Sequence, residues 1–105
     1  MRKKIAILGS TGSIGKNLIN VLKKDRNNFE IILIIADKNI NELLKQAQLF
    51  KIKNIIVTNY KKFLFLKKIL NKKNINIYNN FDSLYEIFKK KKIDYVMNAI
   101  SGLDG

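Results

Sequence analysis

The chain has 105 residues and 47% of them are hydrophobic, which is enough for one domain with a buried core and excludes an intrinsically disordered chain. It contains neither cysteine nor histidine, so disulfides, thiol catalysis and the commonest metal ligands are excluded. The net charge is +13. The longest apolar run, residues 31–36, is too short to cross a bilayer, so we expect a cytoplasmic protein without a membrane partner.

Short apolar runs alternate with amphipathic segments along the chain. Continuous apolar runs of this length are typical of strands buried on both faces. They occupy residues 4–8, 31–36, 54–58, 75–78 and 95–100. Strands that alternate with helices imply crossover connections and a parallel sheet covered on both faces. We therefore predict one domain, residues 1–105, with a doubly wound α/β fold of the Rossmann type, which binds ligands beyond the carboxyl ends of its strands.

Four helices are predicted from apolar residues that recur with helical spacing. The inward residues expected for the first two helices are Ile14, Leu18, Val21 and Leu22, and then Ile40, Leu43, Leu44, Ala47 and Phe50. Those expected for the third helix, residues 60–70, and for the fourth are Phe63, Leu66 and Leu70, and then Phe81, Leu84, Tyr85 and Phe88. Asp82 or Ser83 is predicted to cap the fourth helix, with Glu86 completing a capping box.

The segment GSTGSIG joins the first strand to the first helix and contains Gly9, Gly12 and Gly15. Gly9 suits the tight turn that leaves the strand, Gly12 lets a phosphate approach the backbone, and Gly15 lets the helix lie close to the sheet. The N–H groups at the helix start favour a pyrophosphate, and Thr11 and Ser13 add hydroxyl donors. The segment lacks the Gly-Lys-Ser/Thr of a P-loop, so we predict a bound dinucleotide, the alternative being a purely structural turn.

Asp37, Lys38 and Asn39 follow the second predicted strand, where this architecture meets the adenosine ribose of a dinucleotide. A carboxylate there favours the two ribose hydroxyls of NAD, whereas a basic residue favours the 2′-phosphate of NADP. Asp37 and Lys38 therefore indicate opposite cofactors, and the residues alone leave the choice open. Asp37 is equally suited to capping the next helix.

Tyr85 and Lys89 have the Tyr-x-x-x-Lys spacing of short-chain dehydrogenases, which places two residues on one helix face. Tyr85 also belongs to the predicted apolar stripe, and chance matches are common in a chain so rich in lysine, so we do not assign it a catalytic role. The sequence contains no clustered carboxylates that suggest a metal site or an acid–base pair. We therefore predict no catalytic residues and no metal ligands in this chain.

Three segments together carry a resemblance to a known family: ILGSTGSIG, a Lys-Asn pair after the second strand, and VMNAISGLDG. In these the chain closely resembles the N-terminal part of 1-deoxy-D-xylulose 5-phosphate reductoisomerases. That family rearranges and reduces this sugar phosphate to 2-C-methyl-D-erythritol 4-phosphate in non-mevalonate isoprenoid biosynthesis, using NADPH and a divalent metal such as Mg or Mn, typically as a cytoplasmic homodimer. The resemblance implies pyrophosphate contacts at Thr11, Gly12, Ser13 and Ile14, 2′-phosphate contacts at Lys38 and Asn39, and nicotinamide-side contacts at Ala99 and Ile100.

The chain departs from the family's pattern in two respects. Family members often have glycine where this chain has Asp37. The resemblance implies NADPH, and Asp37 is expected to weaken NADPH binding unless Lys38 offsets its charge or its side chain turns to solvent. The Asn-Lys-Glu motif, the metal-binding acids and the groups that hold the substrate phosphate lie further along in the family. We therefore expect a fragment, from a truncated gene, a frameshift or an excised domain, that is inactive alone.

Two other functions stay open from the sequence: a stand-alone nucleotide-binding domain without catalysis, and a basic nucleic-acid-binding protein. The lysines are mostly scattered in pairs, and the run at residues 89–92 is typical of a helix C-terminus, where the helix dipole favours cations. Lysine, isoleucine and asparagine also share A- and T-rich codons, so composition bias can account for the charge. We therefore expect a solvated basic surface and no nucleic-acid partner.

Overall fold

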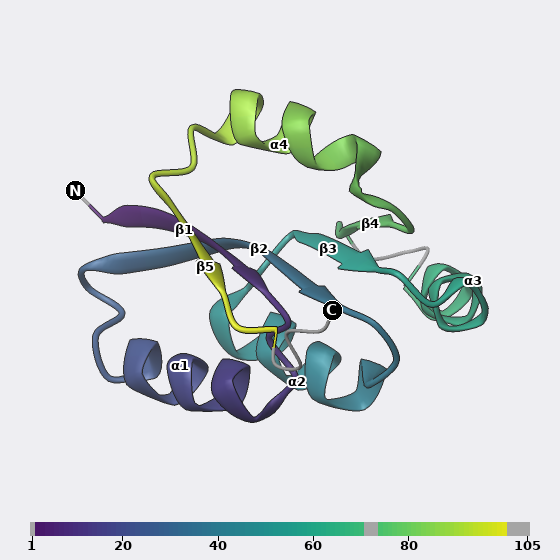
Figure 1. Ribbon diagram of the computed structural model, residues 1–105, viewed down its shortest axis with the longest axis horizontal. Helices are drawn as coiled ribbons and strands as arrows, with labels where there is room; N and C mark the ends of the chain where they lie inside the picture. Colours follow the sequence, from purple (N-terminus) through teal and green to yellow (C-terminus); the bar gives the residue numbers. More distant parts are fainter. Residues whose placement is uncertain (1, 71–73, 101–105) are drawn as a thin grey trace.

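The computed structural model describes residues 2–70 and 74–100, and within these ranges a parallel sheet is covered by helices (Figure 1). The elements in chain order are β1 (Lys3–Leu8), α1 (Ser13–Lys23), β2 (Phe29–Ala36), α2 (Ile40–Phe50), β3 (Asn54–Val57), α3 (Tyr60–Ile69), β4 (Asn76–Tyr78), the 3-10 turn η1 (Phe81–Ser83), α4 (Leu84–Lys91) and β5 (Tyr95–Asn98). The predicted alternation of strands and helices is confirmed.

The strand order is β4-β3-β2-β1-β5, and all neighbours are parallel. The chain moves outward from β1 to β4 and then crosses back to place β5 on the other side of β1. The direction of winding therefore reverses between β1 and β5, and this switch point is where doubly wound sheets bind ligands. In β5, Tyr95 and Val96 are about half exposed, so this strand is not buried on both faces as the apolar run had suggested.

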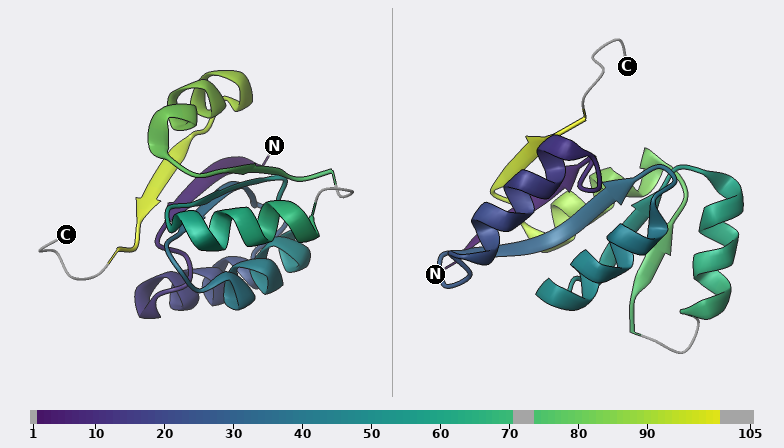
Figure 2. Two further views of the ribbon diagram at one scale, coloured as in Figure 1. Left: turned by 90° about the vertical axis from the view of Figure 1, so that its right-hand side faces the viewer. Right: turned by 90° about the horizontal axis from the view of Figure 1, so that it is seen from below.

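The core lies on both faces of the sheet. On one face, Leu22 of α1, Leu43 of α2 and Leu66 of α3 pack with inward strand residues. On the other face, Ile87 of α4 packs against β1, β2 and β3. Figure 2 shows α4 across the sheet from the other three helices. Right-handed crossovers produce this arrangement, because reversing the direction of winding moves the connecting helix to the opposite face.

The inward face of α1 differs from the predicted stripe. Ile14 and Val21 are 53% and 64% exposed, whereas Gly15, Ile19 and Leu22 are buried. The predicted inward positions of Ile14 and Val21 are therefore wrong. The buried residues follow one another at helical spacing from Gly15, whose close contact with the glycine turn sets the rotation of the helix.

The stripes predicted for α2 and α3 are confirmed, with Leu43 and Leu66 buried at their centres. In α4 the buried residue is Ile87. The predicted inward positions of Phe81 and Tyr85 are wrong, because Phe81 is 48% exposed and lies in the turn before α4, and Tyr85 is 71% exposed. The side chain of Asn80 accepts a hydrogen bond from Asp82 N, so Asp82 lies inside the turn η1 rather than at a cap.

The predicted capping box at Ser83 is not tested. Ser83 directly precedes α4, as a cap would, but its side chain lies outside what the structure describes. Residues 101–105, the end of the segment VMNAISGLDG that contributes to the family resemblance, also lie outside the described residues.

Candidate functional site

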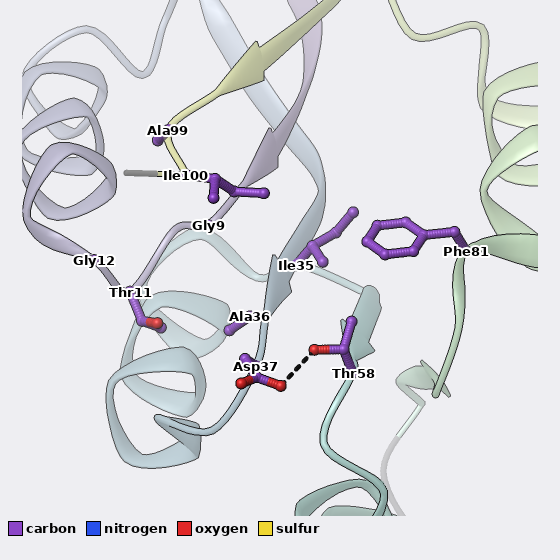
Figure 3. Close-up of a pocket in the computed structure, with 10 residues that line it drawn as sticks. All are labelled: Gly9, Thr11, Gly12, Ile35, Ala36, Asp37, Thr58, Phe81, Ala99 and Ile100. Atoms are coloured by element: carbon purple, nitrogen blue, oxygen red, sulfur yellow. Dashed lines mark hydrogen bonds between the residues drawn. The ribbon is translucent and has the colours of Figure 1, made fainter. Parts of the chain in front are cut away.

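A cleft of about 440 Å³ lies at the carboxyl edge of the sheet, at the switch point between β1 and β5 (Figure 3). Its walls come from the ends of four strands and from the turn η1. The lining residues are Gly9, Thr11, Gly12, Ile35, Ala36, Asp37, Thr58, Phe81, Ala99 and Ile100. A concave, largely apolar cleft with a few polar groups is typical of a small-molecule or cofactor site.

Two of the three glycines are required by the fold itself. Gly9 has a φ of +77°, and a Cβ there would lie 2.9 Å from Cγ1 of Ile100. A Cβ on Gly15 would lie 2.2 Å from the carbonyl oxygen of Gly9 and 2.6 Å from backbone atoms of Ser10. Gly9 thus forms the turn that leaves β1, and Gly15 lets the start of α1 pack directly on that turn.

Gly12 is not required by the fold in this way. Its φ of −78° and ψ of 178° are open to any residue, and a Cβ there would meet only the Gly9 carbonyl oxygen, at 3.8 Å. Gly12 is also the N-cap of α1 and has no side chain to cap it, whereas Asn39 and Asn59 cap α2 and α3 with their side chains. The start of α1 therefore presents N–H donors beside an open space, which suits an anion.

The glycine turn is anchored from α2 by Gln46, which the sequence analysis missed. Gln46 is 2% exposed, and its Nε2 donates a hydrogen bond of 2.8 Å to the carbonyl oxygen of the buried Ser10. The turn is also held by β2, because the N–H groups of Gly9 and Ser10 both donate to the Ile35 carbonyl oxygen. A glutamine on a helix gives no periodic signal that distinguishes this anchor from an exposed residue.

The loop after β2 carries the residues predicted to meet the ribose. Asp37, Lys38 and Asn39 are all exposed, and Asp37 lines the cleft. Oγ1 of Thr58 donates a hydrogen bond of 2.7 Å to Oδ1 of Asp37. Asn39 accepts a hydrogen bond from Glu42 N and caps α2, so the alternative that Asp37 caps this helix is wrong.

The structure brings most of the predicted residues to one edge of the sheet. Gly9, Thr11, Gly12, Asp37, Ala99 and Ile100 line the cleft. The remaining five lie in the two segments that follow the lining residues: Ser13, Ile14 and Gly15 at the start of α1, and Lys38 and Asn39 before α2.

Four lining residues were not predicted: Ile35, Ala36, Thr58 and Phe81. Ile35 and Ala36 end a predicted strand and Thr58 follows the next one, so the rule that ligands bind at the carboxyl ends of strands could have found these three. Phe81 comes from the turn η1, which leads into α4 on the face of the sheet opposite α1, α2 and α3, and no local sequence pattern indicates its position.

The Tyr-x-x-x-Lys pair lies away from the cleft lining. Tyr85 is 71% exposed, and Nζ of Lys89 lies 5.6 Å from the centre of its ring, a cation–π contact on the solvent side of α4. Among residues 2–70 and 74–100, no group of three or more His, Cys, Asp or Glu side chains is placed to hold a metal ion.

The reversal of winding beside a glycine turn defines a doubly wound α/β domain of the Rossmann class. The sequence profile of the 1-deoxy-D-xylulose 5-phosphate reductoisomerase family matches residues 5–105, and the chain belongs to this family. It is 53% identical over 104 residues to the reductoisomerase of Pelagibacter ubique. That match covers 98% of this chain and 27% of the relative, so the chain spans about a quarter of the length of its relative.

Solved structures that share this fold include reductoisomerases of the same name. The reductoisomerase from Zymomonas mobilis in complex with NADPH matches with a TM-score of 0.73 and 22% identity, over 83% of this chain and 23% of that one. A reductoisomerase in complex with NADPH, fosmidomycin and magnesium matches with a TM-score of 0.78 and 24% identity, over 90% of this chain and 23% of that one. At these identities the likeness establishes the fold.

Proposed function

We propose that this chain is the NADPH-binding portion of an enzyme that rearranges and reduces 1-deoxy-D-xylulose 5-phosphate to 2-C-methyl-D-erythritol 4-phosphate. Family membership supports this reaction. The observation that carries the binding role is the open space at Gly12, because nothing that surrounds it in the described structure requires a glycine there. A bound pyrophosphate supplies the missing reason, since it would occupy the volume of a side chain.

The residues present fit the cofactor. Thr11, Gly12, Ser13 and Ile14 would hold the pyrophosphate at the start of α1, where the helix dipole favours an anion. Lys38 and Asn39 would meet the 2′-phosphate. Ala99 and Ile100 follow β5 on the other side of the switch point and would lie toward the nicotinamide, with Ile100 contacting the turn at Gly9. NADPH, when bound, supplies the hydride for the reduction.

Further properties of the whole enzyme rest on the family. One neighbouring structure contains magnesium and fosmidomycin beside NADPH. From the family's general properties we also include a divalent metal, a sugar-phosphate substrate, a homodimer and a cytoplasmic location in the proposal. Within the described residues, no helix is long and apolar enough to cross a membrane. None of these residues is assigned as a metal ligand or a catalytic group.

A nucleotide titration tests the proposal. The fluorescence of NADPH, or the heat of mixing, is followed as the purified chain is added to it. We expect saturable binding that Gly12→Ala weakens about tenfold or more, because the added methyl group displaces the phosphate from its N–H donors and each such charged hydrogen bond contributes about 1.5–3 kcal/mol. Absence of saturable NADPH binding, or equal binding by a folded Gly12→Ala variant, would contradict the proposal.

A further inference from the structure

The carboxylate of Asp37 is held from the side of β3. Oγ1 of Thr58 donates to Oδ1 of Asp37 at 2.7 Å, and Figure 3 shows the two side chains directed toward each other. Both residues line the cleft. The residues come from the ends of neighbouring strands and lie 21 positions apart in the sequence. The bond uses one of about four acceptor sites on the carboxylate that ribose hydroxyls would otherwise approach.

Thr58 is itself fixed by its backbone. Its N–H donates to the Ala36 carbonyl oxygen at 3.0 Å, and Asn59 N donates to the Asp37 carbonyl oxygen at 3.2 Å, so the parallel pairing of β2 and β3 continues into both loops. The side chain of Asn79 donates to the carbonyl oxygens of Val57 and Thr58 at 3.1 Å and 3.4 Å. The backbone that carries the Thr58 hydroxyl is therefore held by hydrogen bonds from both neighbouring segments.

The Thr58–Asp37 hydrogen bond affects cofactor preference, because Asp37 and Lys38 in the loop after β2 favour different nucleotides. A carboxylate at the end of β2 stabilises the ribose hydroxyls of NADH and repels the 2′-phosphate of NADPH. Thr58 competes with the ribose hydroxyls for Oδ1 of Asp37, so it lowers the benefit that NADH gains from the carboxylate. The bond also holds the carboxylate on the Thr58 side of the loop, which leaves Lys38, the next residue along the chain, to receive a phosphate.

We propose that Thr58 is a specificity-determining positioning residue, which restrains Asp37 and so makes a cleft with an acidic residue after β2 compatible with NADPH. The inference rests on the proposed function, because it concerns the same cleft and the same cofactor. The inference goes beyond the proposed function, because it predicts that discrimination between NADPH and NADH depends on a residue outside both the glycine turn and the Lys-Asn pair.

The test measures the dissociation constants of NADPH and NADH for the wild-type chain and for Thr58→Val, Thr58→Ser, Asp37→Gly and the Thr58→Val/Asp37→Gly double variant. We expect Thr58→Val to lower the preference for NADPH by about threefold or more, mainly by tightening NADH. Thr58→Ser keeps the hydroxyl and is expected to keep the wild-type preference. In the Asp37→Gly background, Thr58→Val is expected to change nothing, because the group that it restrains is absent.

Three results would overturn the inference: an unchanged preference in Thr58→Val, a shift toward NADPH, or an equal shift in the Asp37→Gly background. If Thr58→Val does not fold, Thr58→Ala removes the same hydroxyl without placing a methyl group in its polar position and is judged by the same criteria. Failure of the wild-type chain to bind either nucleotide would instead contradict the proposed function, so the two failures are distinguishable.

Discussion

Gly15 and Gly9 lie so close that any Cβ on residue 15 would sit 2.2 Å from the Gly9 carbonyl oxygen. Real Cβ atoms essentially never approach an oxygen at this distance. The obstructing atom belongs to the backbone of a turn that β2 and Gln46 hold in place, so it has little freedom to move away. The start of α1, the exit of β1 and the cleft are therefore one packed unit.

This contact predicts that Gly15→Ala strongly destabilises the protein. We expect a loss of about 3 kcal/mol or more in the free energy of unfolding, because a methyl group is forced into backbone that cannot relax. Gly12→Ala is the matched control and is expected to cost about 1 kcal/mol or less, the usual difference between glycine and alanine at an N-cap. Urea denaturation followed by circular dichroism measures both. Equal losses in the two variants would contradict the packing at Gly15.

The hydrogen bond from Gln46 to Ser10 predicts a further loss of stability. Gln46→Ala removes a buried donor and leaves the Ser10 carbonyl oxygen without it, which is expected to cost about 1–3 kcal/mol. Gln48, an exposed glutamine on the same helix, offers the control, and Gln48→Ala is expected to change the free energy of unfolding by less than about 0.5 kcal/mol. A Gln46→Ala variant as stable as Gln48→Ala would show that the anchor contributes nothing.

The face of α1 gives a third prediction. Ile19→Ala is expected to cost about 2–4 kcal/mol in the free energy of unfolding, because Ile19 is 4% exposed and its loss leaves a cavity. Val21→Ala is expected to cost less than about 0.5 kcal/mol, because Val21 is 64% exposed. Chemical denaturation measures the free energy of unfolding of both variants. A larger loss for Val21→Ala than for Ile19→Ala would support the inward face expected from the apolar pattern.

The strands, their parallel direction and the site edge were predictable because they depend on local signals: apolar runs, helical spacing and glycines at a strand end. The rotation of α1 was not predictable from the sequence. A helical stripe drawn through apolar residues includes Ile14 and Val21 and leaves out Gly15, whose backbone contact sets the rotation. Nor were the restraint of Asp37 by Thr58 or the approach of Phe81, because each joins segments through the sheet topology rather than through neighbours in the sequence.

Asp37 leads to a prediction about cofactor preference. Asp37→Gly is expected to tighten NADPH relative to NADH by about threefold or more, because it removes a negative charge near the 2′-phosphate and an acceptor for the ribose hydroxyls. Competitive titration of the two nucleotides measures the ratio, and Asp25→Gly, a change outside the cleft lining, serves as the control. An unchanged ratio would mean that Asp37 does not face the ribose.

The last prediction separates binding from catalysis. The purified chain of residues 1–105 is expected to bind NADPH but not to oxidise it when 1-deoxy-D-xylulose 5-phosphate and Mg²⁺ are added. The physical reason is that the cleft supplies N–H donors and apolar walls suited to a nucleotide, while the chain spans only 27% of the length of its relative. Absorbance at the reduced-nicotinamide band follows the reaction, with the longer Pelagibacter ubique relative as the positive control. Metal-dependent oxidation by the 105-residue chain alone would show that this portion contains catalytic groups as well as a nucleotide site.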